Sequence, residues 1–166
     1  MNKLKTLTQL KKIVTAEKKR GRTVVLANGC FDLIHIGHIR YLRDARKQGD
    51  VLIVALNSDS SVRRLKGRGR PLLGQKERAE ILASFSSVDF VTIFREPNVE
   101  KILRALNPGV HVKGSDYTRE TVPEKDTVRA LGGRVAIAGG PKVRSTRDVI
   151  RHISGMIPGR EDRNGS

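Results

Sequence analysis

The chain has 166 residues, 37% of them hydrophobic, with 16 glycines. This composition is typical of one globular domain with its own core and excludes a disordered chain. No stretch approaches the ~18 uninterrupted apolar residues of a membrane span, and the basic N-terminus lacks the apolar block of a signal peptide. A single cysteine, Cys30, excludes an internal disulfide and a cysteine-rich zinc site, so we expect a cytoplasmic protein.

Positive charge is the unusual feature of the composition. Lys and Arg number 33 against 17 Asp and Glu, which gives a net charge of +16. Most of it lies in two segments: residues 1–22 hold eight basic residues and one acid, and residues 63–70 hold five basic residues and no acid. A field of this sign attracts polyanions, but it leaves nucleic acid, a membrane surface and a small phosphate compound open.

Apolar periodicity alternates between helix and strand along the chain. The predicted helices are residues 6–20, 37–48, 75–85, 98–106, 123–131 and 145–153, and the predicted strands are residues 23–27, 51–56, 90–94, 110–112 and 135–138. Gly49 is expected to end the second helix as a C-terminal glycine. Five alternations predict a Rossmann-like three-layer α/β/α fold with a five-stranded parallel sheet.

The chain divides into three predicted parts. Residues 1–22 form a basic N-terminal helix that packs on or flanks the domain, residues 23–154 form the domain, and residues 155–166 form a flexible tail. In sheets of this kind the ligand binds at the carboxyl ends of the strands. The segments that directly follow each strand are therefore the candidate positions for site residues.

The first such segment, residues 28–38, holds two histidines around a glycine. Gly37 allows a bound group to approach the backbone, and the start of a helix is a natural phosphate site. His35 and His38 can donate hydrogen bonds there. A metal is the other use of paired histidines, but apart from Asp32 no nearby carboxylate or thiolate supports one.

Two further segments carry polar and basic residues. Asn57 and Asp59 follow the second strand in small polar residues that are typical of a strand-exit turn. Lys66 and Arg70 lie in a run that is either a solvated surface loop or a phosphate clamp. Gly67 and Gly69 would make this segment mobile.

Arg78 falls on the apolar stripe of its helix, so it needs a partner: a bound anion, or an acid such as Asp89.

In residues 113–117, Lys113 can point into a cleft and Asp116 can accept from a sugar hydroxyl, while Tyr117 serves the cleft or the core. Ser145 and Thr146 open the last helix, where a hydroxyl is first of all an N-cap.

These motifs together resemble a known family. Gly29-Cys30-Phe31-Asp32 followed by His35-Ile36-Gly37-His38 is similar to the HxGH signature of nucleotidyltransferases, the cytidylyltransferase-like family. The longer match, which includes NSD, RLKGRGRP, VKGSDY and an ST pair, most resembles the heptose 1-phosphate adenylyltransferases. Those occur alone or as the C-terminal half of a bifunctional kinase/adenylyltransferase, and we expect the stand-alone form.

The resemblance implies a reaction and a set of roles. A substrate phosphate attacks the α-phosphorus of ATP, carried with Mg²⁺, and pyrophosphate leaves; with heptose 1-phosphate the product is ADP-heptose, a lipopolysaccharide precursor. The implied catalytic residues are His35, His38 and Lys66. The implied nucleotide-binding residues are Gly29, Cys30, Phe31, Asp32, Gly37, Arg78, Lys113, Gly114, Asp116, Ser145 and Thr146, and the implied substrate-binding residues are Asn57, Asp59, Arg70 and Tyr117.

Some points stay open at this level. Arg144 and Arg147 flank the ST pair where relatives usually have other residues, which leaves the nucleotide contacts there unsettled. A cytidylyltransferase of the same fold, acting on glycerol 3-phosphate or another small phosphate, is the alternative enzyme. A basic nucleic-acid-binding protein is the alternative of another class, disfavoured by the few aromatic residues and by the lack of a known nucleic-acid-binding motif. The oligomeric state stays open, although the resemblance suggests a homodimer because relatives often form dimers.

Overall fold

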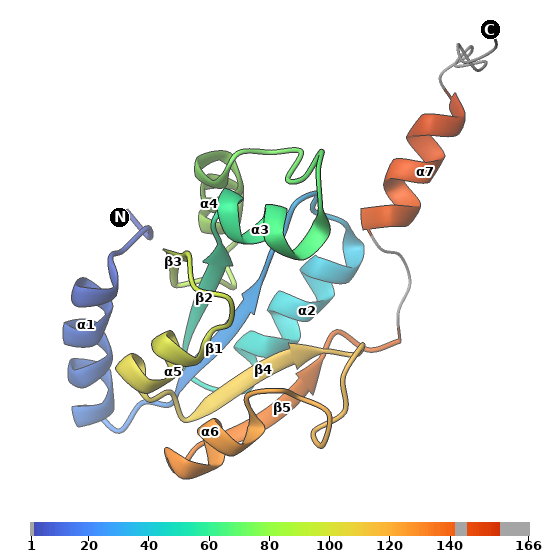
Figure 1. The fold of residues 1–166 in the computed structure, drawn as a ribbon. Coiled ribbons are helices and arrows are strands. Elements are labelled where there is room, and N and C mark those ends of the chain that lie inside the picture. The colour runs from blue at the N-terminus through green and yellow to red at the C-terminus, as the bar shows by residue number, and fades with distance from the viewer. Residues whose placement is uncertain (1, 142–145, 157–166) are drawn as a thin grey trace, which may run out of the picture.

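A computed structural model of the chain describes residues 2–141 and 146–156. Five parallel strands form one sheet in the order β3-β2-β1-β4-β5, with helices on both faces (Figure 1). This confirms the predicted Rossmann-like α/β class. The strands are β1 (Val24–Gly29), β2 (Val51–Asn57), β3 (Phe90–Phe94), β4 (Val110–Gly114) and β5 (Arg134–Ala138).

Seven helices are present in the described part of the chain, one more than predicted. They are α1 (Leu7–Lys19), α2 (Ile36–Arg46), α3 (Asp59–Lys66), α4 (Gln75–Ser84), α5 (Glu100–Leu106), α6 (Lys125–Ala130) and α7 (Thr146–Met156). The helix α3 was missed because it begins directly after β2, where a turn was expected. Ser58 caps the helix by accepting a hydrogen bond from the Ser61 amide at 3.3 Å. Val62 is the one buried apolar side chain of α3, and with three basic residues around it the sequence shows no clear apolar periodicity.

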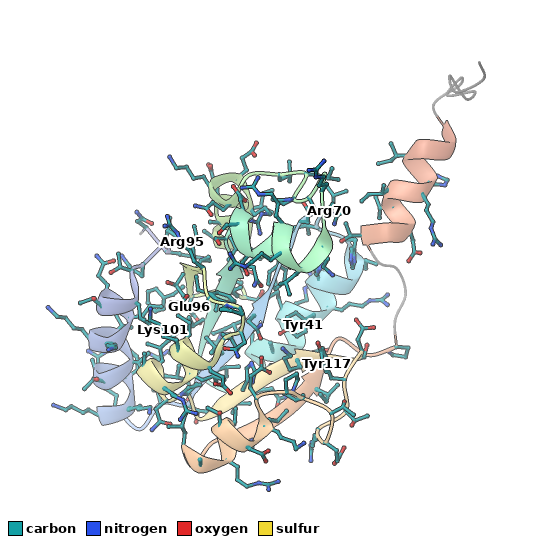
Figure 2. The ribbon with its side chains drawn as sticks, in the orientation of Figure 1. Tyr41, Arg70, Arg95, Glu96, Lys101 and Tyr117 are labelled. Carbon is teal, nitrogen blue, oxygen red and sulfur yellow. The ribbon has the colours of Figure 1, made fainter. Side chains whose placement is uncertain are left out.

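Two apolar cores lie on opposite faces of the sheet. Buried residues of α2 and α4 pack on one face, and buried residues of α1 and α5 pack on the other. On α1, Leu10 and Val14 are buried in the second core, so this basic helix packs on the domain. On α2, the Tyr41 hydroxyl donates to the Val112 carbonyl at 2.8 Å and ties the helix to β4 (Figure 2).

Gly49 has a different role from the predicted one. The helix α2 ends earlier, at Arg46, and Lys47 caps it. Gly49 does not adopt the left-handed conformation of a helix-ending glycine; instead, a Cβ there would lie 2.7 Å from the Val25 side chain and 2.8 Å from the Thr23 carbonyl oxygen. Close packing, and not backbone conformation, requires glycine at this position.

The two ends of the described chain behave differently. Near the N-terminus, the Lys5 amide donates to the Val91 carbonyl and the Val91 amide donates to the Lys3 carbonyl, both at 2.9 Å, so this segment lies along β3. At the other end, α7 projects from the body of the domain (Figure 1) and runs through Met156, past the predicted start of the tail. Within residues 2–141 and 146–156, no helix has the length and apolarity to span a membrane.

Candidate active site

The strand order places a switch point at the centre of the sheet. After β1 the chain builds outward to β2 and β3, and it then returns to place β4 on the other side of β1. The connections from β1 and β4 therefore diverge at their carboxyl ends, which is where ligands of such sheets bind. The segment from Asn28 to His38 leaves β1 at this point, and Lys113 and Gly114 end β4 beside it.

His35 and His38 stack at the start of α2. Their ring centroids lie 3.9 Å apart with an interplanar angle of 28°. His35 is the N-cap of α2, and its Nδ1 accepts a hydrogen bond from the Gly37 amide at 3.1 Å. A neutral His35 ring therefore carries its proton on Nε2. The Phe31 ring lies 5.2 Å from the His38 ring and supports it from the core side.

Burial keeps both rings neutral near pH 7. It lowers the pKa of His38 to about 4, helped by the adjacent His35 and opposed by the Leu33 backbone. Burial also lowers the pKa of His35, opposed by the negative charge of Asp148 on α7. The pair therefore offers neutral N–H donors, which can bind phosphate oxygens without carrying a charge of their own.

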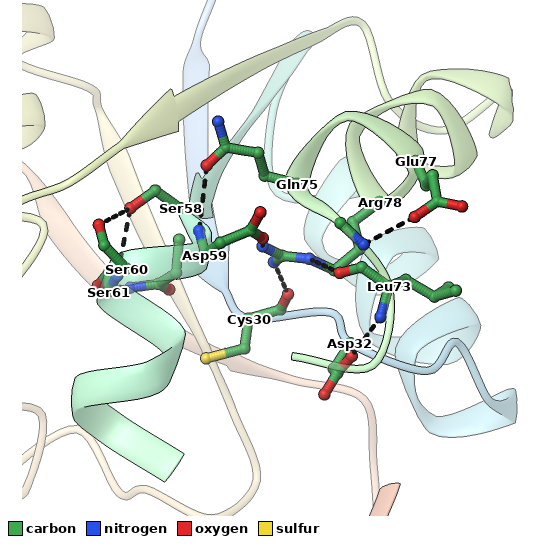
Figure 3. A network of polar contacts seen from close by, with 12 residues as sticks. Cys30, Asp32, Ser58, Asp59, Ser60, Ser61, Leu73, Gln75, Glu77 and Arg78 are labelled. Carbon is green, nitrogen blue, oxygen red and sulfur yellow. Dashed lines mark hydrogen bonds and ion pairs between the residues drawn. The ribbon is translucent and has the colours of Figure 1, made fainter. Parts of the chain in front are cut away.

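A buried arginine joins three segments of this edge (Figure 3). The side chain of Arg78, on α4, is fully buried. Its Nε donates to the Leu73 carbonyl at 3.0 Å, a terminal nitrogen donates to the Cys30 carbonyl, and the other pairs with Asp59 at 2.8 Å. The predicted need for a partner is confirmed, but the suggested partner Asp89 is wrong, because Asp89 pairs with Arg46 at 3.4 Å.

Asp32 fixes the segment between α3 and α4 in a similar way. It is 3% exposed, and one carboxylate oxygen accepts the Leu72 and Leu73 amides at 2.7 and 3.3 Å. The other pairs with the Arg70 Nε at 2.7 Å. Asp32 and Arg70 thus make contacts within the protein that hold this segment against the loop after β1.

Lys113 lies at the end of β4 in a polar cluster. Its ammonium is 3.5 Å from the Asn28 Oδ1 and 3.5 Å from the Glu124 carboxylate, and it lies 4.9 Å from the centre of the Tyr117 ring. Tyr117 is 37% exposed on the loop after β4 (Figure 2), which excludes the core alternative for this residue and leaves the cleft. The Asn28 oxygen also contacts the His111 Nε2 at 3.1 Å.

The remaining predicted site residues differ in burial and in the element that carries them. Asn57 is buried, and its amide donates to the Ser61 hydroxyl at 3.0 Å, inside the first turn of α3. Lys66 is exposed at the end of α3 and not in a loop. Asp116 is exposed after β4. Thr146 begins α7, and its hydroxyl contacts the Leu33 carbonyl at 3.5 Å.

The last predicted residues lie at the end of β1 and around the start of α7. Gly29 ends β1, where a Cβ would lie 3.0 Å from the Phe31 ring, and Cys30 is half-buried. Ser145 and Arg144 lie outside the described residues, as does the Arg147 side chain.

Three residues of this edge were not predicted. Asn28 lies inside the expected segment but was not singled out, and His111 lies inside the predicted strand 110–112. Glu124 follows Lys113 by 11 positions with no pattern to mark it. The signal for the first two is a polar side chain inside an otherwise apolar central strand. Glu124 carries no comparable signal, because only the path of the loop after β4 brings it back.

Comparison with known proteins agrees with this arrangement. The sequence model of the family described as cytidylyltransferase-like matches residues 26–153, most of the chain. The chain belongs to the cytidylyltransferase-like family. The matched region contains the stacked histidines, the Arg78 network, Lys113 and the start of α7.

Curated relatives point to one branch of the family. The chain is 52% identical over 151 residues to the bifunctional protein HldE of Geotalea uraniireducens, and 47% identical over 152 residues to that of Syntrophotalea carbinolica. These matches cover 91% and 92% of the chain, but 31% of each relative. The chain thus spans about a third of the length of these relatives.

Solved structures agree on the fold. A lipopolysaccharide core biosynthesis protein from Thermoplasma volcanium superposes with a TM-score of 0.60 at 29% identity, over 70% of this chain and 94% of that one. A pantoate-beta-alanine ligase from Francisella tularensis superposes with a TM-score of 0.61 at 17% identity, over 88% and 69% of the two chains. The second likeness, at its low identity, concerns the fold alone.

Proposed function

We propose that this cytidylyltransferase-like chain is an adenylyltransferase that joins ATP and heptose 1-phosphate to give ADP-heptose and pyrophosphate. The observation that carries the reaction type is the neutral, stacked His35–His38 pair at the start of α2, at the same edge of the sheet as Lys113. The choice of substrate is supported by the HxGH-to-ST motif series and by the 47–52% identity to HldE proteins.

In this proposal the protein supplies positioning and electrostatic stabilisation, and no protein nucleophile is required. An oxygen of the sugar phosphate attacks the α-phosphorus of ATP, the bond from that phosphorus to the β-phosphate bridging oxygen breaks, and pyrophosphate leaves. His35 and His38 donate hydrogen bonds to the triphosphate as negative charge shifts to the leaving group. Lys113, with Lys66, adds positive charge at the same edge.

Mg²⁺ bound to the triphosphate would neutralise part of its charge. Within the described residues, no group of three or more His, Cys, Asp or Glu side chains is placed to hold a metal ion. The exposed position of Asp116 and Tyr117 beside Lys113 suits contact with a sugar.

We infer that the reaction takes place in the cytoplasm and that the protein is a homodimer. Light scattering of the purified protein measures its mass and so tests the homodimer.

The test is pyrophosphate release with Mg²⁺ for ATP, CTP, GTP and UTP against heptose 1-phosphate, glycerol 3-phosphate and other small phosphates. The proposal expects turnover with ATP and heptose 1-phosphate. Turnover with CTP and glycerol 3-phosphate instead would support the alternative that the family name favours, and would keep the fold and the reaction type. Absence of turnover with every pair would contradict the proposed reaction.

A further inference from the structure

Glu124 is a buried carboxylate that the proposed reaction does not use. It is 5% exposed, and its only ion pair within the described residues is the one with Lys113, at 3.5 Å. A carboxylate is costly to bury without a partner, and a fixed partner limits its movement. Both side chains therefore hold each other in place at the carboxyl end of β4.

An anchoring role for α6 does not explain Glu124. The helix α6 is held by Val128, which is buried in the core shared with α1 and α5. It is also tied to α5 by Thr127, whose hydroxyl contacts the Glu100 carboxylate at 3.1 Å and the Arg104 guanidinium at 3.3 Å. The Glu124 side chain, by contrast, points to the strand end and to Lys113.

The other neighbours of Lys113 do not fix its position by themselves. The Asn28 oxygen is shared with His111 and is 3.5 Å away. The Tyr117 ring covers the ammonium from the solvent side without a hydrogen bond. We propose that Glu124 is a positioning residue for nucleotidyl transfer: it holds the Lys113 ammonium between Asn28 and Tyr117, where a phosphate group of the reaction meets it.

This inference rests on the proposed function, and a double-mutant cycle tests it. Glu124→Gln keeps the size of the side chain and removes its charge, and we expect kcat/KM to fall about tenfold, because a displaced charge stabilises the transferring phosphate poorly. In the Lys113→Met background, Glu124→Gln should change kcat/KM less than twofold. Glu120→Gln, on the same loop but exposed, is the matched control and should behave as wild type.

The readouts separate positioning from structure. A structural role would lower Tm and the fraction of active protein equally in both backgrounds, whereas positioning should lower kcat/KM in the wild-type background alone. Where Lys113→Met leaves no measurable turnover, the same cycle is measured on the Kd of ATP by calorimetry. Wild-type activity in Glu124→Gln, or equal losses in both backgrounds, would overturn the inference while the proposed function stands. Absence of wild-type turnover would instead contradict the function itself.

Discussion

His38 combines burial with a position at the start of a helix. Replacing it with alanine removes a hydrogen-bond donor from the proposed transition state, and we expect kcat to fall by about 10²–10³. The fold should persist, because Phe31, whose ring contacts His38, and Tyr41 remain packed in the core between α2 and the sheet. Pyrophosphate release and thermal unfolding of His38→Ala measure the two effects.

The matched control is His152→Ala, on the exposed face of α7. It should keep wild-type activity. A His38→Ala protein that is folded and fully active would remove His38 from the mechanism.

His111 makes stability depend on pH. It is fully buried, and burial, with the nearby charge of Lys113, lowers its pKa from 6.5 to about 3. Between these two values the unfolded chain binds the proton and the folded chain does not, so the free energy of unfolding falls as pH falls. The slope from this residue approaches ~1.4 kcal/mol per pH unit, and His38 adds to it with its own lowered pKa.

Urea unfolding at a series of pH values between 7 and 4 checks this prediction. His111→Gln retains an N–H donor toward Asn28 but cannot titrate, so its stability should depend less steeply on pH. An unchanged slope in this variant would assign the pH dependence to other groups.

At the scale of elements, the connection from α2 to β2 depends on Gly49. Its hydrogen atom faces Val25 on β1 and Thr23, which directly precedes β1, at distances that a methyl group cannot occupy. We expect Gly49→Ala to lower the free energy of unfolding by about 2 kcal/mol, because β1 or the turn must shift. Chemical unfolding of both variants measures this.

Gly109→Ala is the matched comparison. A Cβ at that position meets the Thr23 side chain at 3.4 Å, an ordinary contact, and the variant should be close to wild type. Equal stability of the two alanine variants would show that the α2–β2 turn adapts freely.

Sequence patterns predicted the elements better than the contacts among them. The buried strands could be predicted because apolar runs are local, and the HxGH segment because its residues are adjacent. The helix α3 was missed, since one buried valine among basic residues gives little periodicity. The partner of Arg78 was missed with it, because Asp59 lies at the start of that helix.

At the scale of the whole molecule, the charge of +16 is concentrated on exposed surfaces. Arg63, Arg64, Lys66 and Arg68 are exposed, while Arg70 is paired with Asp32. We expect weak binding of a single-stranded RNA that falls steeply between about 50 and 200 mM salt. Fluorescence anisotropy with wild-type protein and His38→Ala should give the same curves.

Such curves would indicate non-specific attraction by surface charge. Tight binding of one RNA sequence that persists at high salt would contradict this prediction and favour the nucleic-acid alternative. The KM for ATP should also rise with salt, because the same field attracts the triphosphate.

The N-terminal segment along β3 has a consequence for association. The outer strand of an open sheet carries unpaired amides and carbonyls, and an apolar strand such as β3, with Phe90, Val91 and Phe94, is a template for another chain. Lys3 and Lys5 occupy both hydrogen-bonding groups of Val91 and bring positive charge to the same edge. The segment thereby blocks the addition of a foreign strand and protects the folded protein against aggregation from this side of the sheet.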